Sequence, residues 1–198
     1  MAKRLFDIIF SFLGLILVLP LLLLLAVLIK RESPGPVFYR GVRIGKGGRL
    51  FRIFKFRSMV ENAEELGGPS TAGGDSRLTK IGKFLKKYQL DELPQLINVL
   101  RGEMSLVGPR PEVKPYIDML PEEQKNVILS IKPGMTDLAS LWNFHESEVL
   151  KSSPDPEKAY LEKIRPEKIR LQLEYVKNCS FWLDLKIVFK TIWKIFKE

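Results

Sequence analysis

Two adjacent carboxylates, Asp91 and Glu92, stand at the start of an expected helix, in the run Asp91-Glu92-Leu93-Pro94-Gln95. Pro94 suits a first helical turn, where its missing N–H group costs nothing. Acidic residues there often only cap a helix, because they complement its free N–H groups and its dipole. Alternatively, the same dipole keeps Asp91 ionised as a nucleophile, and Glu92 holds a divalent cation through hard oxygen contacts. The pair alone leaves both interpretations open.

Four basic residues could supply the positive charge that phosphate chemistry needs, namely Lys55, Arg57, Lys86 and Arg110. An arginine can hold phosphate through two parallel hydrogen bonds, whereas a lysine supplies a point charge. Arg110 lies in Gly-Pro-Arg-Pro, where a proline on each side restricts the backbone. This turn would aim the guanidinium without ordering a flexible loop. A rigid turn with a solvated arginine would have the same sequence.

Three other features have ordinary structural explanations. His145 is expected in a solvated loop, and Cys179 as a packed or inert thiol in a reducing compartment. The run Gly45-Lys46-Gly47-Gly48 lacks the spacing and the strand-to-helix context of a phosphate loop, so it is expected to be a hairpin turn. One histidine and one cysteine exclude both a Cys/His zinc cluster and an internal disulfide.

Composition indicates one domain with two very different parts. The chain has 198 residues and a net charge of +9, from 32 Lys plus Arg against 23 Asp plus Glu. Its mean hydropathy of −0.01 averages over an apolar segment, because only Ser11, Gly14 and Pro20 interrupt the apolar run of residues 8–29. The remaining polar body is itself basic.

The apolar run is long enough to cross a membrane, since 22 helical residues at about 1.5 Å each exceed a hydrocarbon core of about 30 Å. No small-x-small cleavage site follows it, which argues against a signal peptide. Pro20 near its middle would kink the helix. Basic pairs flank the run equally, so the positive-inside bias assigns no orientation. A bent span and a re-entrant hairpin both remain open.

The polar body is predicted to begin with a β-hairpin and to continue mainly as helices. Residues 37–43 and 50–57 flank the glycine-rich turn as its two strands. Residues 67–74, with four glycines, are expected to be a flexible loop. Helices are predicted over residues 60–66, 79–87, 92–100, 121–130, 157–178 and 181–196.

The last of these helices carries an aromatic stripe flanked by lysines, which includes Trp182 and Trp193. Such a helix suits the headgroup layer of a membrane. An ordinary amphipathic helix packed on a core would show the same spacing. The apolar run at the other end of the chain favours the membrane interpretation.

Taken together, several strings resemble the bacterial sugar transferase family of monotopic phosphoglycosyl transferases. They are KFRSM at 55–59, DSRLT at 75–79, LDELPQL at 90–96, NVL at 98–100, MSLVGPRP at 104–111 and DLK at 184–186. Because the chain begins at the apolar run, it is similar to small members that consist of the catalytic domain alone.

The resemblance implies an α+β, predominantly helical fold. Residues 1–32 would form a re-entrant membrane helix broken near Pro20. Residues 33–198 would form a catalytic domain, with a short hairpin and interfacial amphipathic helices, on the cytoplasmic face of the bacterial inner membrane. Members move a sugar-1-phosphate from a UDP-sugar to polyprenol (undecaprenyl) phosphate, which initiates glycan assembly.

The site residues follow by the same resemblance. Asp91 matches the nucleophile that forms a covalent phosphosugar intermediate, and Glu92 matches the Mg²⁺ ligand. Lys55 and Arg110 would stabilise charge on the transferring phosphate, with Arg57 and Lys86 as further substrate contacts. Pro20, Trp182 and Trp193 would contact the membrane.

The sequence departs from the family pattern at three places. Lys86 stands where many members have arginine, so the charge is kept but the bidentate fork is lost. Residues 137–143 (DLASLWN) replace a commoner Gly-Leu/Trp-Ala-Gln, in a loop expected to face the sugar or the nucleotide. Gln172 stands where some members have an acidic residue.

Two other interpretations remain. One is a membrane-anchored basic module that binds anionic lipid or nucleic acid, and the other is an inactive scaffold of a glycan-assembly complex. The enzyme interpretation expects no nucleic-acid partner and leaves a homo-oligomer open. It does not identify the sugar.

Overall fold

The computed structural model describes residues 2–63, 66, 74–143, 150 and 155–197. In these residues helices predominate and the strands are short, which confirms the predicted α+β, mostly helical class. His145 and most of the expected 67–74 loop lie outside the described residues. Cys179 is exposed and therefore not packed, while its expected inertness stays a prediction.

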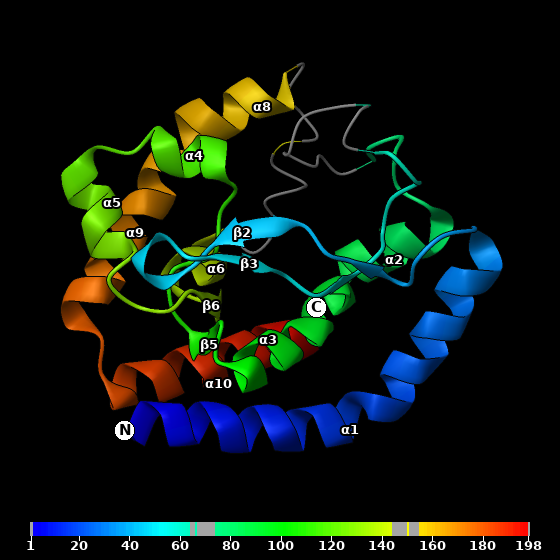
Figure 1. Ribbon diagram of the computed structural model, residues 1–198, viewed down its shortest axis with the longest axis horizontal. Coiled ribbons are helices and arrows are strands. Elements are labelled where there is room, and N and C mark those ends of the chain that lie inside the picture. The colour runs from blue at the N-terminus through cyan, green and yellow to red at the C-terminus, as the bar shows by residue number, and fades with distance from the viewer. Residues whose placement is uncertain (1, 64–65, 67–73, 144–149, 151–154, 198) are drawn as a thin grey trace.

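Helix α1 (Ala2–Glu32) contains the whole apolar run, with Pro20 inside it. It is long and apolar enough to cross a membrane, and only 11% of its most apolar window is buried. Figure 1 shows α1 running along one side of the molecule and then bending toward α2 (Lys80–Lys87). Pro20 explains a bend, because proline has no N–H group for the helical ladder and its ring clashes with the preceding turn.

Both ends of α1 are attached to the same folded body. Near its start, the Arg4 guanidinium donates to the Val99 and Leu100 carbonyls at 2.6 and 2.9 Å. Toward its end, Leu25 and Ile29 are buried against α2 and its neighbours. Finally, the Glu32 carboxylate accepts from the Lys80 N–H at 2.6 Å, at the start of α2. A straight helix could not make both sets of contacts with one compact body.

The predicted hairpin is confirmed, although its ladder is interrupted. Strand β2 (Val42–Ile44) pairs antiparallel with β3 (Leu50–Arg52), and β1 (Phe38–Tyr39) pairs with β4 (Lys55–Phe56). The turn is the short helix η1 (Lys46–Gly48), in which Gly47 and Gly48 have φ of 65° and 76°. Side chains rarely adopt this conformation, so glycine is needed there.

Most of the predicted helices are present with slightly shifted ends. Thr79 caps α2, as its side chain accepts from the Gly82 N–H. The segment predicted as 92–100 begins as a 3₁₀ helix, η2 (Leu90–Gln95), and continues as α3 (Leu96–Arg101). The other helices are α4 (Lys114–Asp118), α5 (Glu122–Ile128), α6 (Leu138–Trp142), α8 (Pro156–Ala159), the π-helical turn η3 (Tyr160–Ile164), α9 (Arg165–Asn178) and α10 (Phe181–Lys197).

Several features differ from the sequence prediction. Helices α4 and α6 were not predicted, and α6 lies within residues 137–143, which were expected to form a loop. The helix over 60–66 is wrong, because its described residues form turns and a bend, and Asn62 has a left-handed φ of 59°. In addition, β5 (Ser105–Val107) and β6 (Gly134–Thr136) form a parallel pair that the sequence analysis missed. Three-residue strands are too short to show a periodic pattern, and parallel pairing joins segments far apart in the chain.

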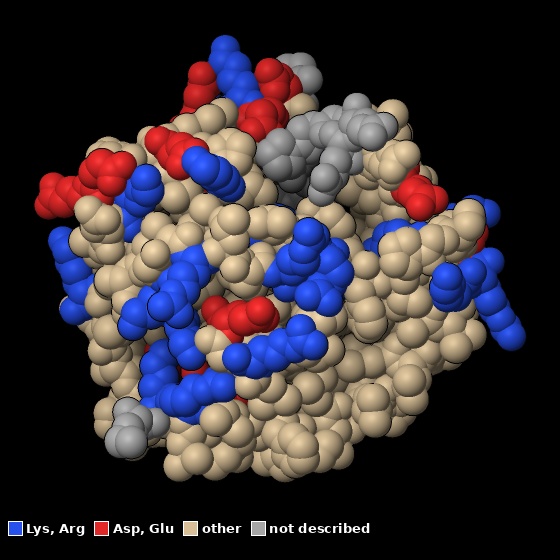
Figure 2. Space-filling view, in the orientation of Figure 1, with Lys and Arg blue, Asp and Glu red and all other residues tan. Residues whose placement is uncertain are grey.

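The lipid-facing interpretation of α10 is compatible with its exposed aromatic side chains. Trp182 is 78% exposed and Trp193 is 64% exposed, while Asp184 and Ile187 are buried. The rings of Phe6 in α1 and Phe181 in α10 meet edge to face at 5.5 Å. In Figure 2 the edge formed by α1 is almost free of charged side chains, whereas Lys and Arg gather over the hairpin.

We predict that Pro20→Leu makes part of the population span the membrane. Leucine restores the helical hydrogen bond, and removing an interior proline favours a straight helix by about 3 kcal/mol. The measurement is thiol labelling of Ala2→Cys from either side of sealed vesicles, in a Cys179→Ser background. Leu17→Ile, at another exposed position of the helix, is the control. If position 2 keeps its wild-type labelling side in Pro20→Leu, Pro20 does not turn the helix.

Candidate active site

The two acidic residues lie inside η2 and do not cap it. The chain enters η2 through Gln89, whose φ of 53° is left-handed, and the side chain of Gln89 makes no capping bond. Asp91 is only 2% exposed. The structure therefore does not support simple capping as the role of Asp91, which points to a partner within the protein.

That partner is Lys86, in the last turn of α2. Its Nζ lies 2.9 Å from Asp91 Oδ2. Burial alone would lower the pKa of Lys86, but the carboxylates of Asp91 and Glu92 outweigh it and raise this pKa above its usual value. Lys86 therefore stays charged near neutral pH and places a positive charge beside the Asp91 carboxylate.

Glu92 lies between two other cations that come from distant parts of the chain. Its Oε1 accepts from Lys55 Nζ at 2.8 Å and from the Arg110 guanidinium. Burial would raise the pKa of Glu92, but Arg110 and Lys55 hold it well below its usual value. The side chain keeps 16% of its surface exposed, so an ionised carboxylate remains within reach of a ligand.

Lys55 is the cation of this cluster whose pKa lies closest to neutral pH. Burial lowers its pKa to about 8, an effect that the neighbouring Glu92 carboxylate only partly offsets. Arg110 and Lys86 lower it further, because like charges nearby disfavour protonation. Lys55 thus loses its proton at a pH only slightly above neutral.

The structure brings five of the six predicted catalytic and substrate-binding residues together and leaves one apart. Lys55 comes from β4, Lys86 from α2, Asp91 and Glu92 from η2, and Arg110 from the turn after β5. Arg57 instead donates to the carbonyls of Ser33 and Pro34, in the segment that follows α1.

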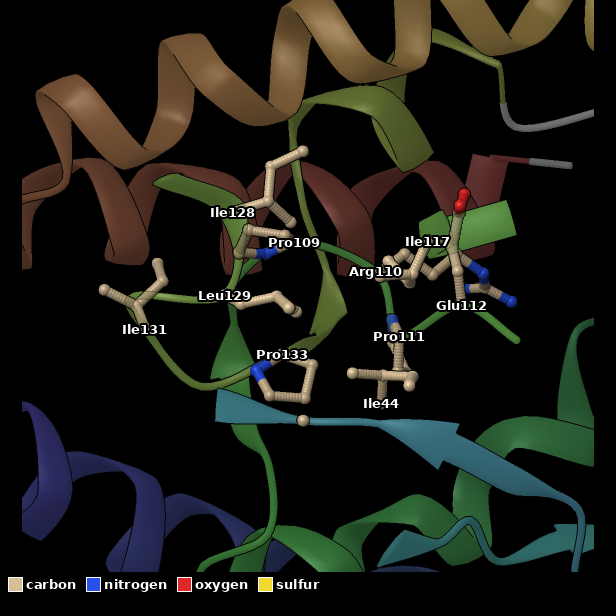
Figure 3. Close-up of a pocket in the computed structure, with 11 residues that line it drawn as sticks. Ile44, Pro109, Arg110, Pro111, Glu112, Ile117, Ile128, Leu129, Ile131 and Pro133 are labelled. Atoms are coloured by element: carbon tan, nitrogen blue, oxygen red, sulfur yellow. The ribbon is translucent and has the colours of Figure 1, made fainter. Parts of the chain in front are cut away.

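A pocket borders the turn that carries Arg110, but it is too small for a substrate. Figure 3 shows it lined by isoleucine, leucine and proline side chains, with Arg110 and Glu112 at one side. Its volume is about 10 Å³, which is at the lower limit for a single water molecule. We interpret it as imperfect packing behind the turn rather than as a binding site.

The donor set fits a magnesium ion that a substrate helps to hold. In the described part of the chain, no three His, Cys, Asp or Glu side chains gather as a complete metal site. Mg²⁺, however, usually takes one or two carboxylates together with substrate phosphates and water. Glu92, ionised, partly exposed and next to Asp91, meets that requirement.

The chain is similar to known proteins along its whole length. The family described as bacterial sugar transferase matches residues 1–198. The UDP-N-acetylgalactosamine-undecaprenyl-phosphate N-acetylgalactosaminephosphotransferase of Aeromonas hydrophila is 42% identical over 196 residues, which cover 96% of this chain and 42% of that protein. The UDP-glucose:undecaprenyl-phosphate glucose-1-phosphate transferase of Klebsiella pneumoniae is 41% identical, over 98% of this chain and 40% of that protein.

A third relative is covered more completely. The exopolysaccharide production protein PSS of Rhizobium leguminosarum bv. phaseoli is 38% identical over 202 residues, which cover 96% of this chain and 92% of that protein. By contrast, the chain spans only about two fifths of the Aeromonas and Klebsiella proteins.

We predict that Lys55 titrates near pH 8 in the folded protein without metal. Its folded pKa lies below the value of about 10.4 expected for an unfolded chain, so its charge is lost as the pH rises through about 8. Competitive acylation of lysines followed by mass spectrometry, in a chelating buffer, measures this pKa. Glu92→Gln should lower it further, because the Glu92 carboxylate stabilises the ammonium. Equal reactivity profiles in folded and denatured protein would contradict the prediction.

Proposed function

Since the chain belongs to the bacterial sugar transferase family, we propose that it transfers a sugar-1-phosphate from a UDP-sugar to undecaprenyl phosphate. The names of its relatives at about 40% identity support this reaction class. The observation that carries the proposal is a buried carboxylate, Asp91, beside Glu92 and within a group of three cations from three elements. When all are ionised, this group keeps a surplus positive charge, which suits an anionic phosphate.

Asp91 is proposed as the nucleophile. Its carboxylate oxygen attacks the β-phosphorus of the UDP-sugar, the bond from that phosphorus to the bridging oxygen breaks, and UMP leaves with the electron pair. An oxygen of the polyprenol phosphate then attacks the same phosphorus and releases Asp91, which leaves a polyprenyl-diphosphate-linked sugar. Lys86, whose Nζ lies 2.9 Å from Asp91 Oδ2, would hold this carboxylate in place for the attack.

The remaining residues would bind and stabilise the transferring phosphate. Arg110 and Lys55, which pair with Glu92 in this structure, can both donate to phosphate oxygens. Glu92 would hold Mg²⁺, which supplies charge neutralisation on the phosphate when bound. Lys86 adds a point charge where an arginine would add a fork.

We further propose that residues 1–32 form a re-entrant anchor and that the body from residue 33 onward lies on the cytoplasmic face of the bacterial inner membrane. The support is that both ends of α1 contact one body while its outer side chains are exposed. Trp182 and Trp193 would lie at the headgroup level. This arrangement presents Asp91 to a soluble nucleotide sugar and to a lipid-borne phosphate.

We predict that Asp91→Asn lowers UMP release by at least about 10³-fold, because an amide is not a nucleophile for this step. The assay is Mg²⁺-dependent UMP release from a panel of UDP-sugars, with undecaprenyl phosphate and nanodisc-embedded protein. Asp118→Asn, at an exposed position on α4, is the matched control and should retain activity. Equal release from Asp91→Asn and wild type would reject Asp91 as nucleophile and favour a binding role.

Glu92→Gln should raise the Mg²⁺ concentration needed for half-maximal release by at least about tenfold, because it removes an anionic oxygen ligand. The measurement is a Mg²⁺ titration of the same assay. Membrane association should stay at the wild-type level, because Glu92 is distant from α1 in the sequence. Its carboxylate pairs with Lys55 and Arg110, which are not part of α1. An unchanged Mg²⁺ dependence would remove Glu92 from the metal site.

A further inference from the structure

Asp137 is a completely buried carboxylate that the proposed reaction does not use. It is 0% exposed. In the part of the chain that the structure describes, its partners are three neutral N–H groups. Oδ1 accepts from the Ser140 N–H at 2.7 Å, while Oδ2 accepts from the Arg110 N–H at 3.2 Å and from Gln172 Nε2 at 3.3 Å. A buried polar side chain is retained where its hydrogen bonds have a structural role, and these three bonds lead to three separate places in the chain.

Capping of α6 accounts for only half of this arrangement. The bond from the Ser140 N–H to Oδ1 is an ordinary N-cap interaction, which Ser or Asn would provide about equally well. The second oxygen faces away from α6, toward the turn of Arg110 and toward α9. Through Oδ2, Asp137 links the start of α6 to the turn of Arg110 and to α9. A capping role does not require these two contacts.

The β5–β6 pair explains why Asp137 meets Arg110. Val107 pairs with Thr136, and the two chains continue side by side, with the Gly108 N–H donating to the Thr136 carbonyl at 3.1 Å. A Cβ on Gly134 would lie 2.1 Å from the Gly108 nitrogen, so the two backbones touch. Asp137 comes directly after β6, and Arg110 follows β5 at the same end of the parallel pair. The two residues therefore lie close together.

The contact reaches the candidate active site in one further step. The Arg110 guanidinium binds the Glu92 carboxylate. Pro109 and Pro111 restrict the backbone on either side of Arg110, and neither has an N–H group to donate. The Arg110 N–H is therefore the one backbone donor within this Pro-Arg-Pro turn, and Asp137 accepts from it.

We propose that Asp137, oriented by Gln172, is a positioning residue that fixes the backbone of Arg110 and so aims its guanidinium at Glu92 and the transferring phosphate. This inference rests on the proposed function for its catalytic consequence, but the backbone contact can be tested by itself.

The first test is hydrogen exchange of the Arg110 amide. Asp137→Asn keeps the size of the side chain and can still cap α6, but it places an NH₂ group against the two donors on Arg110 and Gln172. We expect the Arg110 amide to lose protection in this variant. Because its proline neighbours have no amide, a peptide spanning this turn reports it cleanly. Unchanged exchange would overturn the proposal, whether or not the protein is a transferase.

The second test is kinetic. Asp137→Asn is expected to lower kcat/KM for UMP release by about 10- to 100-fold, as for other residues that orient an active group. Asp155→Asn, which removes the capping carboxylate of α8, is the matched control and should leave kcat/KM unchanged.

A double-mutant cycle separates positioning from general destabilisation. In an Arg110→Ala background, Asp137→Asn should change kcat/KM by less than about twofold, because the side chain that it aims is gone. Equal losses in both backgrounds would overturn the proposal. If the wild type releases no UMP from any sugar nucleotide, the proposed function fails, and the amide exchange alone then decides the structural contact.

Discussion

The ion pairs around Asp91 and Glu92 hold together the part of the structure on which everything else in the site depends. They join β4, α2, η2 and the turn after β5, which are separate in the sequence. Charges of this kind are costly to remove from water, and each carboxylate here has a cationic partner that offsets part of this cost. Three cations against two carboxylates leave a surplus that a phosphate can neutralise.

Charged side chains also attach α1 to the folded body. Arg4 and Asp7 lie within the helix, yet their side chains turn inward, where Asp7 accepts from the Leu106 N–H at 3.0 Å and Arg4 binds carbonyls at the end of α3. Apolar side chains cover the outer surface. Because polar atoms at one end and Glu32 at the other both bind the body, the helix bends around it instead of leaving it.

The sequence analysis named five charged residues that the structure brings together, but it did not say which cation pairs with which carboxylate. Acidic and basic residues at those positions indicated phosphate chemistry, and four cations were proposed with them. It could not assign Arg57 to the segment after α1, because that depends on where the end of α1 lies relative to β4. It also missed the role of Asp137, since a single Asp before a short helix looks like an ordinary cap.

The sequence by itself determined the long apolar helix, the hairpin and most of the other helices, because these depend on local composition and periodicity. Only the tertiary structure decided which cation meets which carboxylate. It also decided that both ends of α1 contact one body and that β5 and β6 pair in parallel. These contacts join residues far apart in the chain, and no local pattern encodes a distance between such residues.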